Sequence, residues 1–256
     1  MLLGAFKGAH SGWTLENIRS LFKEPFIGAY KKSIEVSLVT ALLGGLLGLG
    51  IAYSVIREGT PRWIRSAMTT FSGVAANFGG IPLAFAFIAT IGSIGIVTKF
   101  LKEQLGIDLY GPGIGFTLFS TTGVELVYLY FQIPLMILVI APAIDGLKRE
   151  WREAAANLGA TPWQYWRHVG IPVLMPSILG TVVLLFGNAF AAYATAYALT
   201  SGSVNLVPVM IGYYFSGNVL DNPHLAQALA LGMFVVLAAM MALYVPLQRR
   251  AARWAK

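Results

Sequence analysis

The chain has 256 residues, of which 57% are hydrophobic and only 11% are charged, whereas typical soluble domains carry roughly 25% charged residues. Several uncharged runs exceed the roughly 20 residues that a helix needs to cross a bilayer. These numbers exclude an ordinary soluble domain and predict an all-α polytopic membrane protein. The net charge of +7 does not indicate a nucleic-acid partner, because Lys and Arg gather at the ends of the apolar runs, as membrane topology requires.

The first segment, residues 1–32, is mixed and moderately polar, and it has no apolar core followed by a small-residue cleavage site. We expect an extramembrane or interfacial segment with one short amphipathic helix, capped by Ser11 or Thr14. Its apolar face would contain Leu15, Ile18, Leu21 and Phe22.

The membrane domain is expected over residues 33–250, with its first span at Ile34–Ile56. A basic turn with Arg57, Arg62 and Arg65 follows. Residues 66–98 carry no charge, but Asn77–Pro82 breaks them in the middle. We expect one kinked span over Ala67–Ile91 and then a surface segment. Broken backbone in a membrane is tolerated where it lines a cavity or is buried in protein, so Asn77 is a candidate gate.

The second half of the domain is expected to contain three further spans. Lys99–Gly115 resembles an external loop with a short interfacial helix, and the third span follows at Phe116–Ile144. The fourth span is expected at Ser177–Leu199. Residues 202–220 are uncharged and rich in Gly, Ser, Asn and Pro, so they would dip into the protein without crossing. The fifth span would start after Asn222-Pro223 and cover Leu225–Leu247.

A charged island over residues 145–172 interrupts this apolar sequence. It holds seven charged residues: Asp145, Lys148, Arg149, Glu150, Arg152, Glu153 and Arg167. The run of alanines after Glu153 favours a short helix with small side chains, which fits closely into a partner's groove. Gly159 suits the C-cap of that helix. Thr161-Pro162 has the pattern of an N-cap followed by a first-turn proline, so a second short helix would start there.

The distribution of Lys and Arg predicts the orientation. With the island in the cytoplasm, eleven Lys and Arg lie inside and two lie in the outside loops, as the positive-inside rule requires. Five spans then place the C-terminus in the cytoplasm and residues 1–32 outside. The N-terminal segment, however, is itself basic. Either it tolerates this bias, or a further helix is needed before it.

The island contains a spaced motif. Glu153-Ala154-Ala155 is followed after three residues by Gly159, and after nine more by Val169, Gly170, Ile171 and Pro172. This pattern resembles the signature loop of permeases from binding-protein-dependent ABC importers, with Val169 and Ile171 standing where Ile and Leu are more usual. The resemblance covers about residues 30–250. Among these permeases, the chain is most similar to those of spermidine/putrescine, iron, thiamine and phosphonate-type importers.

The resemblance implies a type I ABC importer permease fold with a cytoplasmic coupling helix. It implies that the loop is seated on an ATPase subunit, so that ATP and Mg would bind to that partner and this chain would hold no cofactor. The implied coupling residues are Glu153, Ala154, Ala155, Gly159, Ala160, Ile171 and Pro172. Further implied partners are a second permease subunit, an extracytoplasmic substrate-binding protein and the inner or plasma membrane. Trp13–Asn17 resembles the external segment that usually follows an additional first helix.

Polar residues inside the apolar runs are candidates for a substrate pathway. Glu125, Tyr128 and Gln132 are spaced for one helical face. An anion between amphipathic rings would suit a cation, so a polyamine is the first substrate hypothesis. Alternatively, Glu125 is hydrated and inert at an interface. Asn188 and Thr195 share a face of the fourth span, where they would line the pathway or bond across helices.

Two other classes of function stay open on the residues alone. A self-contained secondary transporter usually shows repeated halves, and we find none. An intramembrane enzyme needs convergent catalytic groups, but the spans offer only Glu125 and dispersed neutral polar residues. The chain has no phosphate-binding loop, no cysteine and no plausible metal cluster. We therefore predict a non-enzymatic subunit with no catalytic and no metal-binding residues of its own.

Overall fold

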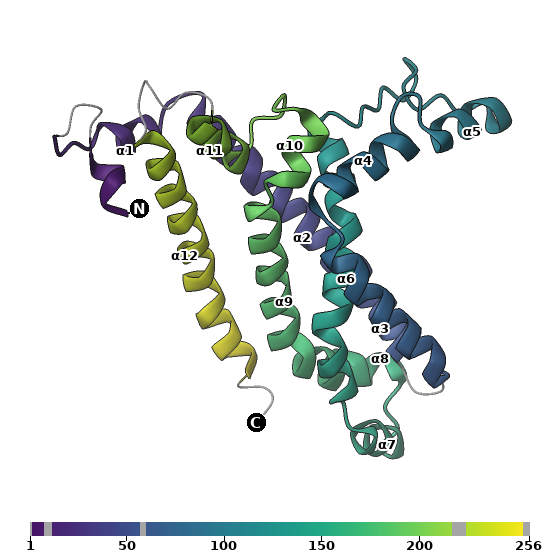
Figure 1. Ribbon diagram of the computed structural model, residues 1–256. Helices are drawn as coiled ribbons and strands as arrows, with labels where there is room; N and C mark the ends of the chain where they lie inside the picture. The colour runs from purple at the N-terminus through teal and green to yellow at the C-terminus, as the bar shows by residue number, and fades with distance from the viewer. Residues whose placement is uncertain (1, 8–11, 57–59, 217–223, 253–256) are drawn as a thin grey trace. The chain divides into compact units, whose positions relative to one another are not determined.

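The computed structural model describes residues 2–7, 12–56, 60–216 and 224–252, and over these it is helical, with no strand (Figure 1). In chain order the α-helices are α1 (Glu16–Ser20), α2 (Phe26–Ile56), α3 (Arg62–Asn77), α4 (Gly80–Ile91), α5 (Ile96–Leu105), α6 (Thr121–Asp145), α7 (Arg149–Asn157), α8 (Pro162–Tyr165), α9 (Ile171–Ala191), α10 (Ala194–Thr200), α11 (Val207–Ser216) and α12 (Leu225–Ala252). A short 3-10 helix covers Leu2–Phe6, and a π-helical turn, Trp166–Gly170, joins α8 to α9.

Five helical segments among the described residues are long and apolar enough to cross a membrane. They are Phe26–Ile56, Gly80–Leu105, Thr121–Asp145, Pro162–Ala191 and Leu225–Arg250. The predicted fold class is therefore confirmed. The division into an N-terminal segment and a membrane domain at residue 32 stays a prediction, although α2 already begins at Phe26.

The chain forms two compact units. Unit 1 contains residues 1–40, 78–129 and 187–238, and unit 2 contains residues 41–77, 130–186 and 239–256. Helices α2, α6, α9 and α12 each contribute residues to both units.

Unit 1 is held by side chains that satisfy backbone groups of distant elements. The Tyr30 hydroxyl donates to the Leu229 carbonyl at 2.6 Å, and the Ser33 hydroxyl accepts from the Val207 N–H at 2.9 Å. Helix α4 packs against α10. Because buried backbone groups without partners are costly, these contacts fix how the short helices α10 and α11 pack within the unit.

Unit 2 is held by close approach of α2 to α6. A Cβ atom on Gly44 would lie 2.7 Å from the Gln132 Cβ, and one on Gly48 would lie 2.6 Å from the Met136 Cβ. The side chain of Gln132 is fully buried and donates to the Leu185 carbonyl at 2.8 Å. Small residues thus let the helices meet, as expected in membranes, and one amide ties α6 to α9.

Two expected spans are wrong in their extent. The single kinked span over Ala67–Ile91 is two helices, α3 and α4, which are separated at Phe78-Gly79, within the predicted break. The expected span at Ser177–Leu199 ends at Ala191, and α10 follows as a separate helix.

The start of the same span also differs from the prediction, because the helix runs from Pro162 to Ala191 without an end at Pro172. Proline lacks an N–H, and its ring clashes with the carbonyl four residues earlier in a regular helix. The π turn at Trp166–Gly170 ends two residues before Pro172 and changes the hydrogen-bonding register of the helix before the proline.

The remaining elements agree more closely with the sequence. Helix α6 begins five residues after the predicted start of the third span, α5 is the short helix expected near Lys99, and α12 begins at Leu225. In the N-terminal segment, the Thr14 hydroxyl accepts from the Glu16 N–H at 3.1 Å, but Phe22 is exposed. Other residues used in the predictions lie outside the described residues: Ser11, Arg57, Leu220, Asn222, Pro223, Arg253 and Lys256.

Candidate functional site

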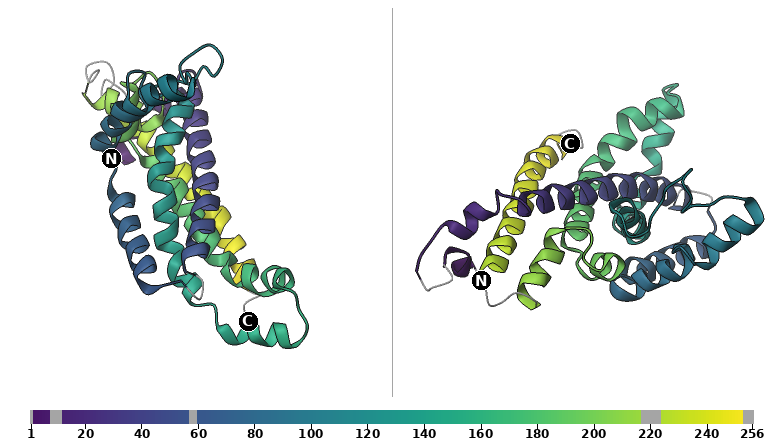
Figure 2. Two further views of the ribbon diagram at one scale, coloured as in Figure 1. Left: turned by 90° about the vertical axis from the view of Figure 1, so that its right-hand side faces the viewer. Right: turned by 90° about the horizontal axis from the view of Figure 1, so that it is seen from above.

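The charged island folds as a helical hairpin in unit 2, with α7 and the α8 segment side by side in both views of Figure 2. None of the residues of α7 is buried. Arg149 and Glu153 form an ion pair at 2.7 Å across one turn of this helix. Exposed pairs of this kind contribute only a few tenths of a kcal/mol, roughly 0.3–0.5. The ion pair therefore orders the charged face of α7 rather than holding the hairpin together.

The end of α7 is defined by backbone geometry at Gly159. This glycine has φ of +77°, its N–H donates to the Ala156 carbonyl at 2.9 Å, and the Ala160 N–H donates to the Ala155 carbonyl at 3.0 Å. The two bonds form a Schellman motif, which reverses the chain after a helix. The predicted C-cap is therefore confirmed.

The second half of the hairpin begins with a capping box. The Thr161 hydroxyl accepts from the Gln164 N–H at 3.3 Å, and the Gln164 side chain accepts from the Thr161 N–H at 2.7 Å. Pro162 occupies the first turn of α8. This confirms the predicted start of the second short helix. The turn of the hairpin therefore consists of the few residues around Gly159 and Ala160.

Aromatic contacts anchor the hairpin to α2. The rings of Tyr53 and Trp166 meet edge to face, with centroids 4.7 Å apart, an arrangement that aromatic pairs prefer. The ring of Trp166 packs back over Gly170, where a Cβ atom would lie 2.6 Å from it. The absence of a side chain at Gly170 therefore allows Trp166 to reach Tyr53.

The outer surface of the hairpin exposes large apolar side chains. Leu158 is 88% exposed and Trp163 is 69% exposed, while Ala154 and Gly159 beside them are also exposed. Apolar side chains are unfavourable in water, and an exposed apolar patch therefore indicates an interaction site. The hairpin therefore exposes small and apolar residues on its outer surface, and the hydrogen bonds that form its turn are made within the hairpin itself.

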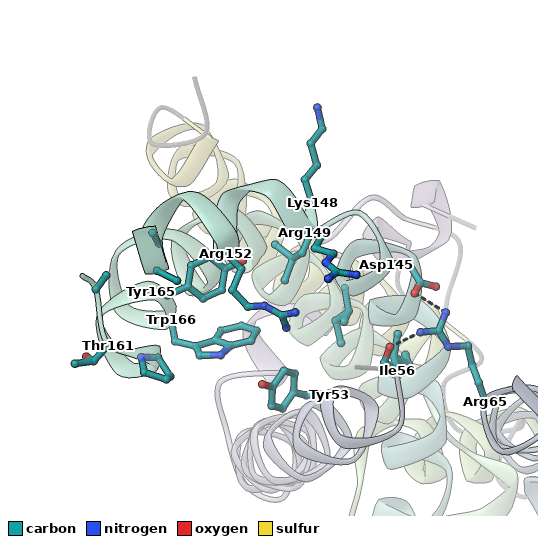
Figure 3. A pocket seen from close by; sticks show the side chains of 16 residues that line it. Tyr53, Ile56, Arg65, Asp145, Lys148, Arg149, Arg152, Thr161, Tyr165 and Trp166 are labelled. Carbon is teal, nitrogen blue, oxygen red and sulfur yellow. Dashed lines mark hydrogen bonds and ion pairs between the residues drawn. The ribbon is translucent and has the colours of Figure 1, made fainter. Parts of the chain in front are cut away.

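A cleft of about 570 Å³ lies between the hairpin and the ends of α2, α3 and α6 (Figure 3). Arg65 crosses one side of it, where it forms an ion pair with Asp145 at 2.9 Å and donates to the Ile56 carbonyl. Asp145 is the last residue of α6, where a carboxylate is disfavoured by the helix dipole. Arg65 offsets this charge and joins the last residues of α2 and α6 to α3.

The structure brings part of the predicted coupling set to this region. Ala155 and Ala160 line the cleft, whereas Glu153 does not. Ile171 and Pro172 lie in the first turn of α9, beyond the π turn. Their joint role in coupling stays a prediction.

The predicted pathway residues on α6 lie in different surroundings. Glu125 is half-buried and interacts electrostatically with Glu35. Tyr128 is buried, and its hydroxyl donates to the Ala192 carbonyl at 2.7 Å. Gln132 is fully buried against α9. These positions give Tyr128 and Gln132 a packing role, and whether they also contact a substrate stays a prediction.

The other pathway candidates are Thr195, Asn77 and Asn188. Thr195 is buried, and its hydroxyl accepts from the Gly80 N–H at 2.8 Å, which satisfies the start of α4. It therefore makes the bond between helices that the sequence left as one alternative. Asn77 is exposed at the end of α3, where its amide donates to the Gly73 carbonyl, and Asn188 is exposed on α9.

Sequence reasoning missed the residues that anchor the hairpin. Arg65 was counted only for topology, and Tyr53 and Trp166 were not identified as partners. Their contacts join helices far apart in the sequence, so no local pattern reports them. The one available signal is that Asp145 ends an apolar run, where a carboxylate needs a cation. Among the described residues, no group of His, Cys, Asp and Glu is arranged to hold a metal ion.

The fold and the hairpin together define a polytopic helical membrane protein with an exposed helical hairpin between two of its spans. Residues 113–253, more than half of the chain, match the family described as "Binding-protein-dependent transport system inner membrane component". The chain therefore belongs to this family, which contains the permeases of ABC importers. It is a multi-pass membrane protein of a transport family.

Individual proteins support the assignment. The chain is 28% identical over 191 residues to a probable sulfate transport system permease from Nephroselmis olivacea, covering 72% of this chain and 62% of that protein. It is 26% identical over 239 residues to the trehalose permease SugB of Mycobacterium tuberculosis, covering 93% of this chain and 78% of that one. The match thus spans less than two thirds of the sulfate permease.

Solved structures share the fold. A bacterial ABC transporter involved in the import of the acidic polysaccharide alginate matches with a TM-score of 0.76 and 20% identity, covering 97% of this chain and 87% of that one. The alginate transporter in complex with its alginate-bound periplasmic protein matches with a TM-score of 0.73 and 19% identity, covering 93% and 83%. This likeness supports the type I importer permease fold.

Proposed function

We propose that this permease passes a small solute from an extracytoplasmic binding protein into the cytoplasm by alternating access, driven by ATPase subunits that dock on the hairpin of residues 145–172. The observation that carries the proposal is the exposure of Leu158 at 88% on a hairpin whose turn is fully hydrogen-bonded. A partner that covers Leu158 removes this apolar surface from water.

The anchors of the hairpin suggest how movement is transmitted. A force on α7 would reach α2 through the Trp166–Tyr53 contact and would reach α3 and α6 through the Arg65–Asp145 pair. Such contacts can transmit a movement of α7 to the spans, because packed helices shift between discrete arrangements rather than deform continuously. The chain itself would perform no hydrolysis, and ATP and Mg would bind to the partner.

The proposed assembly contains two permease subunits, identical or different, two ATPase subunits and a binding protein. The distribution of Lys and Arg supports a cytoplasmic hairpin and C-terminus. The alginate transporter crystallised with a periplasmic protein, which supports a binding-protein partner for this chain on the opposite side of the membrane.

The substrate is the least constrained part of the proposal. The similar proteins described above are named for sulfate, trehalose and alginate. The polyamine hypothesis therefore rests on Glu125 and on the sequence resemblance to spermidine/putrescine permeases, and these relatives do not support it. Calorimetric titration of the cognate binding protein with sulfate, molybdate, trehalose, an alginate oligosaccharide and spermidine would assign the substrate. Binding of spermidine alone would support a polyamine, whereas its failure to bind would remove that hypothesis.

The coupling role is tested by uptake in cells. Gly159→Asp would place a side chain at φ of +77° and a charge at the turn, and Glu153→Arg would reverse the charge of the exposed face of α7. Both variants should insert into the membrane normally and abolish uptake. Glu103→Arg, an equal charge reversal at an exposed residue of α5, is the control and should transport normally. Normal uptake by both hairpin variants would contradict the coupling role.

A secondary transporter makes a different prediction. The purified chain in proteoliposomes would then move its substrate without ATPase subunits. We expect no such transport in the absence of the ATPase and ATP.

A further inference from the structure

The cleft beside the hairpin has a charge pattern that docking of an ATPase on the outer surface of α7 does not explain. Among the described residues that line the cleft, four are cationic and only Asp145 is anionic. The cationic residues are Arg65, Lys148, Arg149 and Arg152. The walls therefore carry an excess of positive charge.

The neighbouring carboxylates reduce this excess but do not remove it. Asp145 pairs with Arg65 at 2.9 Å, and Glu153, which lies outside the lining, pairs with Arg149 at 2.7 Å. Together with Glu150, the next residue of α7, the lining residues and these neighbours comprise four cations and three carboxylates. In Figure 3 the side chains of Arg149 and Arg152 extend from α7 toward the cleft, whereas that of Lys148 extends away from it. Two guanidinium groups therefore approach the same space from one helix.

The lining of the cleft also includes aromatic and apolar side chains. These are the edge-to-face pair of Tyr53 and Trp166, together with Ile56 and Ile144. Trp and Tyr are enriched where a membrane meets water, because their rings are apolar at one end and polar at the other. One cleft therefore offers both guanidinium groups and a surface suited to carbon chains.

The position of the cleft along the spans agrees with this chemistry. Ile56 is the last residue of α2 and Asp145 is the last residue of α6, and both helices are candidate membrane spans. The ends of membrane spans lie at the depth of the lipid headgroups. Helix α7 also begins beside the cleft, at Arg149, and Lys148 at its N-cap makes no side-chain hydrogen bond to it, so the first backbone N–H groups add partial positive charge.

We propose that this cleft binds a phosphate-bearing anion between Arg149 and Arg152, with its carbon portion against Tyr53 and Trp166. Guanidinium groups bind phosphate through paired, charge-assisted hydrogen bonds. Basic pockets between membrane helices are a known form of site for anionic lipid headgroups. The same chemistry also accepts free phosphate, and the experiment below separates the two sources. This site goes beyond the proposed function and does not depend on an ATPase partner.

The test is calorimetric titration of the purified full-length chain in an uncharged detergent. The probes are dihexanoyl-phosphatidylglycerol, dihexanoyl-phosphatidylcholine and inorganic phosphate. The test variant is Arg149→Gln/Arg152→Gln. The matched control is Arg249→Gln/Arg250→Gln, which removes the same charge from exposed residues of α12. A third variant, Arg149→Lys/Arg152→Lys, keeps the charge, and thermal melting of all variants checks that they are folded.

We expect phosphatidylglycerol to bind, and the Gln test variant to bind it at least about tenfold more weakly, because two charge-assisted hydrogen-bond donors are lost. The control should change by less than about twofold, and the Lys variant should lie between. If inorganic phosphate binds and competes with the lipid, the source is free phosphate; if it does not, the source is the lipid headgroup. Equal losses in the test and control variants, or no binding of phosphatidylglycerol and phosphate, would overturn the proposal.

Discussion

The hairpin of residues 145–172 and the buried contacts between the helices are stabilised in opposite ways. The turn of the hairpin is formed by bonds between near neighbours, such as Ala160 to Ala155 and Thr161 to Gln164. The buried contacts join residues far apart in the sequence, such as Gln132 to Leu185. A segment held by its own local hydrogen bonds can expose its surface to a partner without loss of structure. The buried contacts, in contrast, are needed for the fold.

This difference predicts two kinds of mutant. Changes on the exposed face of the hairpin should impair coupling and leave stability nearly unchanged. Changes at the buried contacts should lower stability first.

The largest effect is expected at Gly48, where α2 approaches α6. The Cβ atom of Gly48→Ala would lie 2.6 Å from the Met136 Cβ and 2.7 Å from the Ile133 carbonyl oxygen. Such overpacking costs about 3 kcal/mol of unfolding free energy. In Gly50→Ala the Cβ would meet nothing within 4 Å, so its higher helix propensity should leave stability unchanged or raised. Thermal unfolding in detergent measures both, and equal stability of the two variants would contradict the packing.

A smaller loss is expected for Thr195→Val. The substitution removes the acceptor of the half-buried Gly80 N–H, and an unsatisfied donor at such a position costs about 1 kcal/mol. Thr200→Val is the control on the same helix, because Thr200 is equally buried but its hydroxyl donates only to the Ala196 carbonyl one turn earlier. The control should therefore lose much less. If thermal unfolding shows equal losses, the bond between α4 and α10 does not stabilise the fold.

Within the hairpin, Gly159→Ala should cost about 1 kcal/mol locally, because a left-handed conformation is unfavourable for a residue with a Cβ. Gly146→Ala is the control, since Gly146 is also exposed but has no positive φ. Hydrogen exchange of the Ala160 amide should quicken in the first variant and not in the second. Unchanged exchange in both would mean that the C-cap does not hold the turn.

The smallest effect concerns an exposed pair outside the hairpin. The hydrogen bond from Lys102, at 2.7 Å, lowers the pKa of Asp108 below its usual value. A lowered folded-state pKa means that this stabilisation is full above the usual pKa and is lost as the pH falls through the folded one. Lys102→Ala should raise the Asp108 pKa toward the ordinary value. NMR titration of the carboxyl carbon checks this, and an unchanged pKa would show that the pair does not persist in solution.

The hairpin could be predicted from the sequence because its turn depends on local chemistry. A glycine in a left-handed conformation after the alanine run, and a threonine before Pro162, specify the turn without help from the rest of the chain. The break before Gly80 was also readable, because Gly79, Gly80 and Pro82 interrupt the helix pattern.

Other features could not be predicted, because they depend on residues that are distant in the sequence or on local changes in helix geometry that a residue pattern does not reveal. The helix continues through Pro172, and the π turn before it changes the hydrogen-bonding register where proline has no N–H to donate. It ends at Ala191 without any Gly or Pro at that point, and the Tyr128 hydroxyl binds the Ala192 carbonyl there. The polarity of the candidate pathway residues inside spans suggests contact with a substrate, but in Tyr128, Gln132 and Thr195 it is used for hydrogen bonds to residues distant in the sequence.

The central claim is that the exposed surface of the hairpin docks an ATPase subunit. The most direct measurement is the affinity of the cognate ATPase subunit for the chain reconstituted in nanodiscs, compared between Leu158→Asp and Leu3→Asp. Leu158 is 88% exposed on the hairpin and Leu3 is 68% exposed in the N-terminal segment. We expect at least about a tenfold loss of affinity for Leu158→Asp, since a charge would be buried in the interface, and no change for Leu3→Asp. Wild-type affinity of Leu158→Asp would contradict the claim.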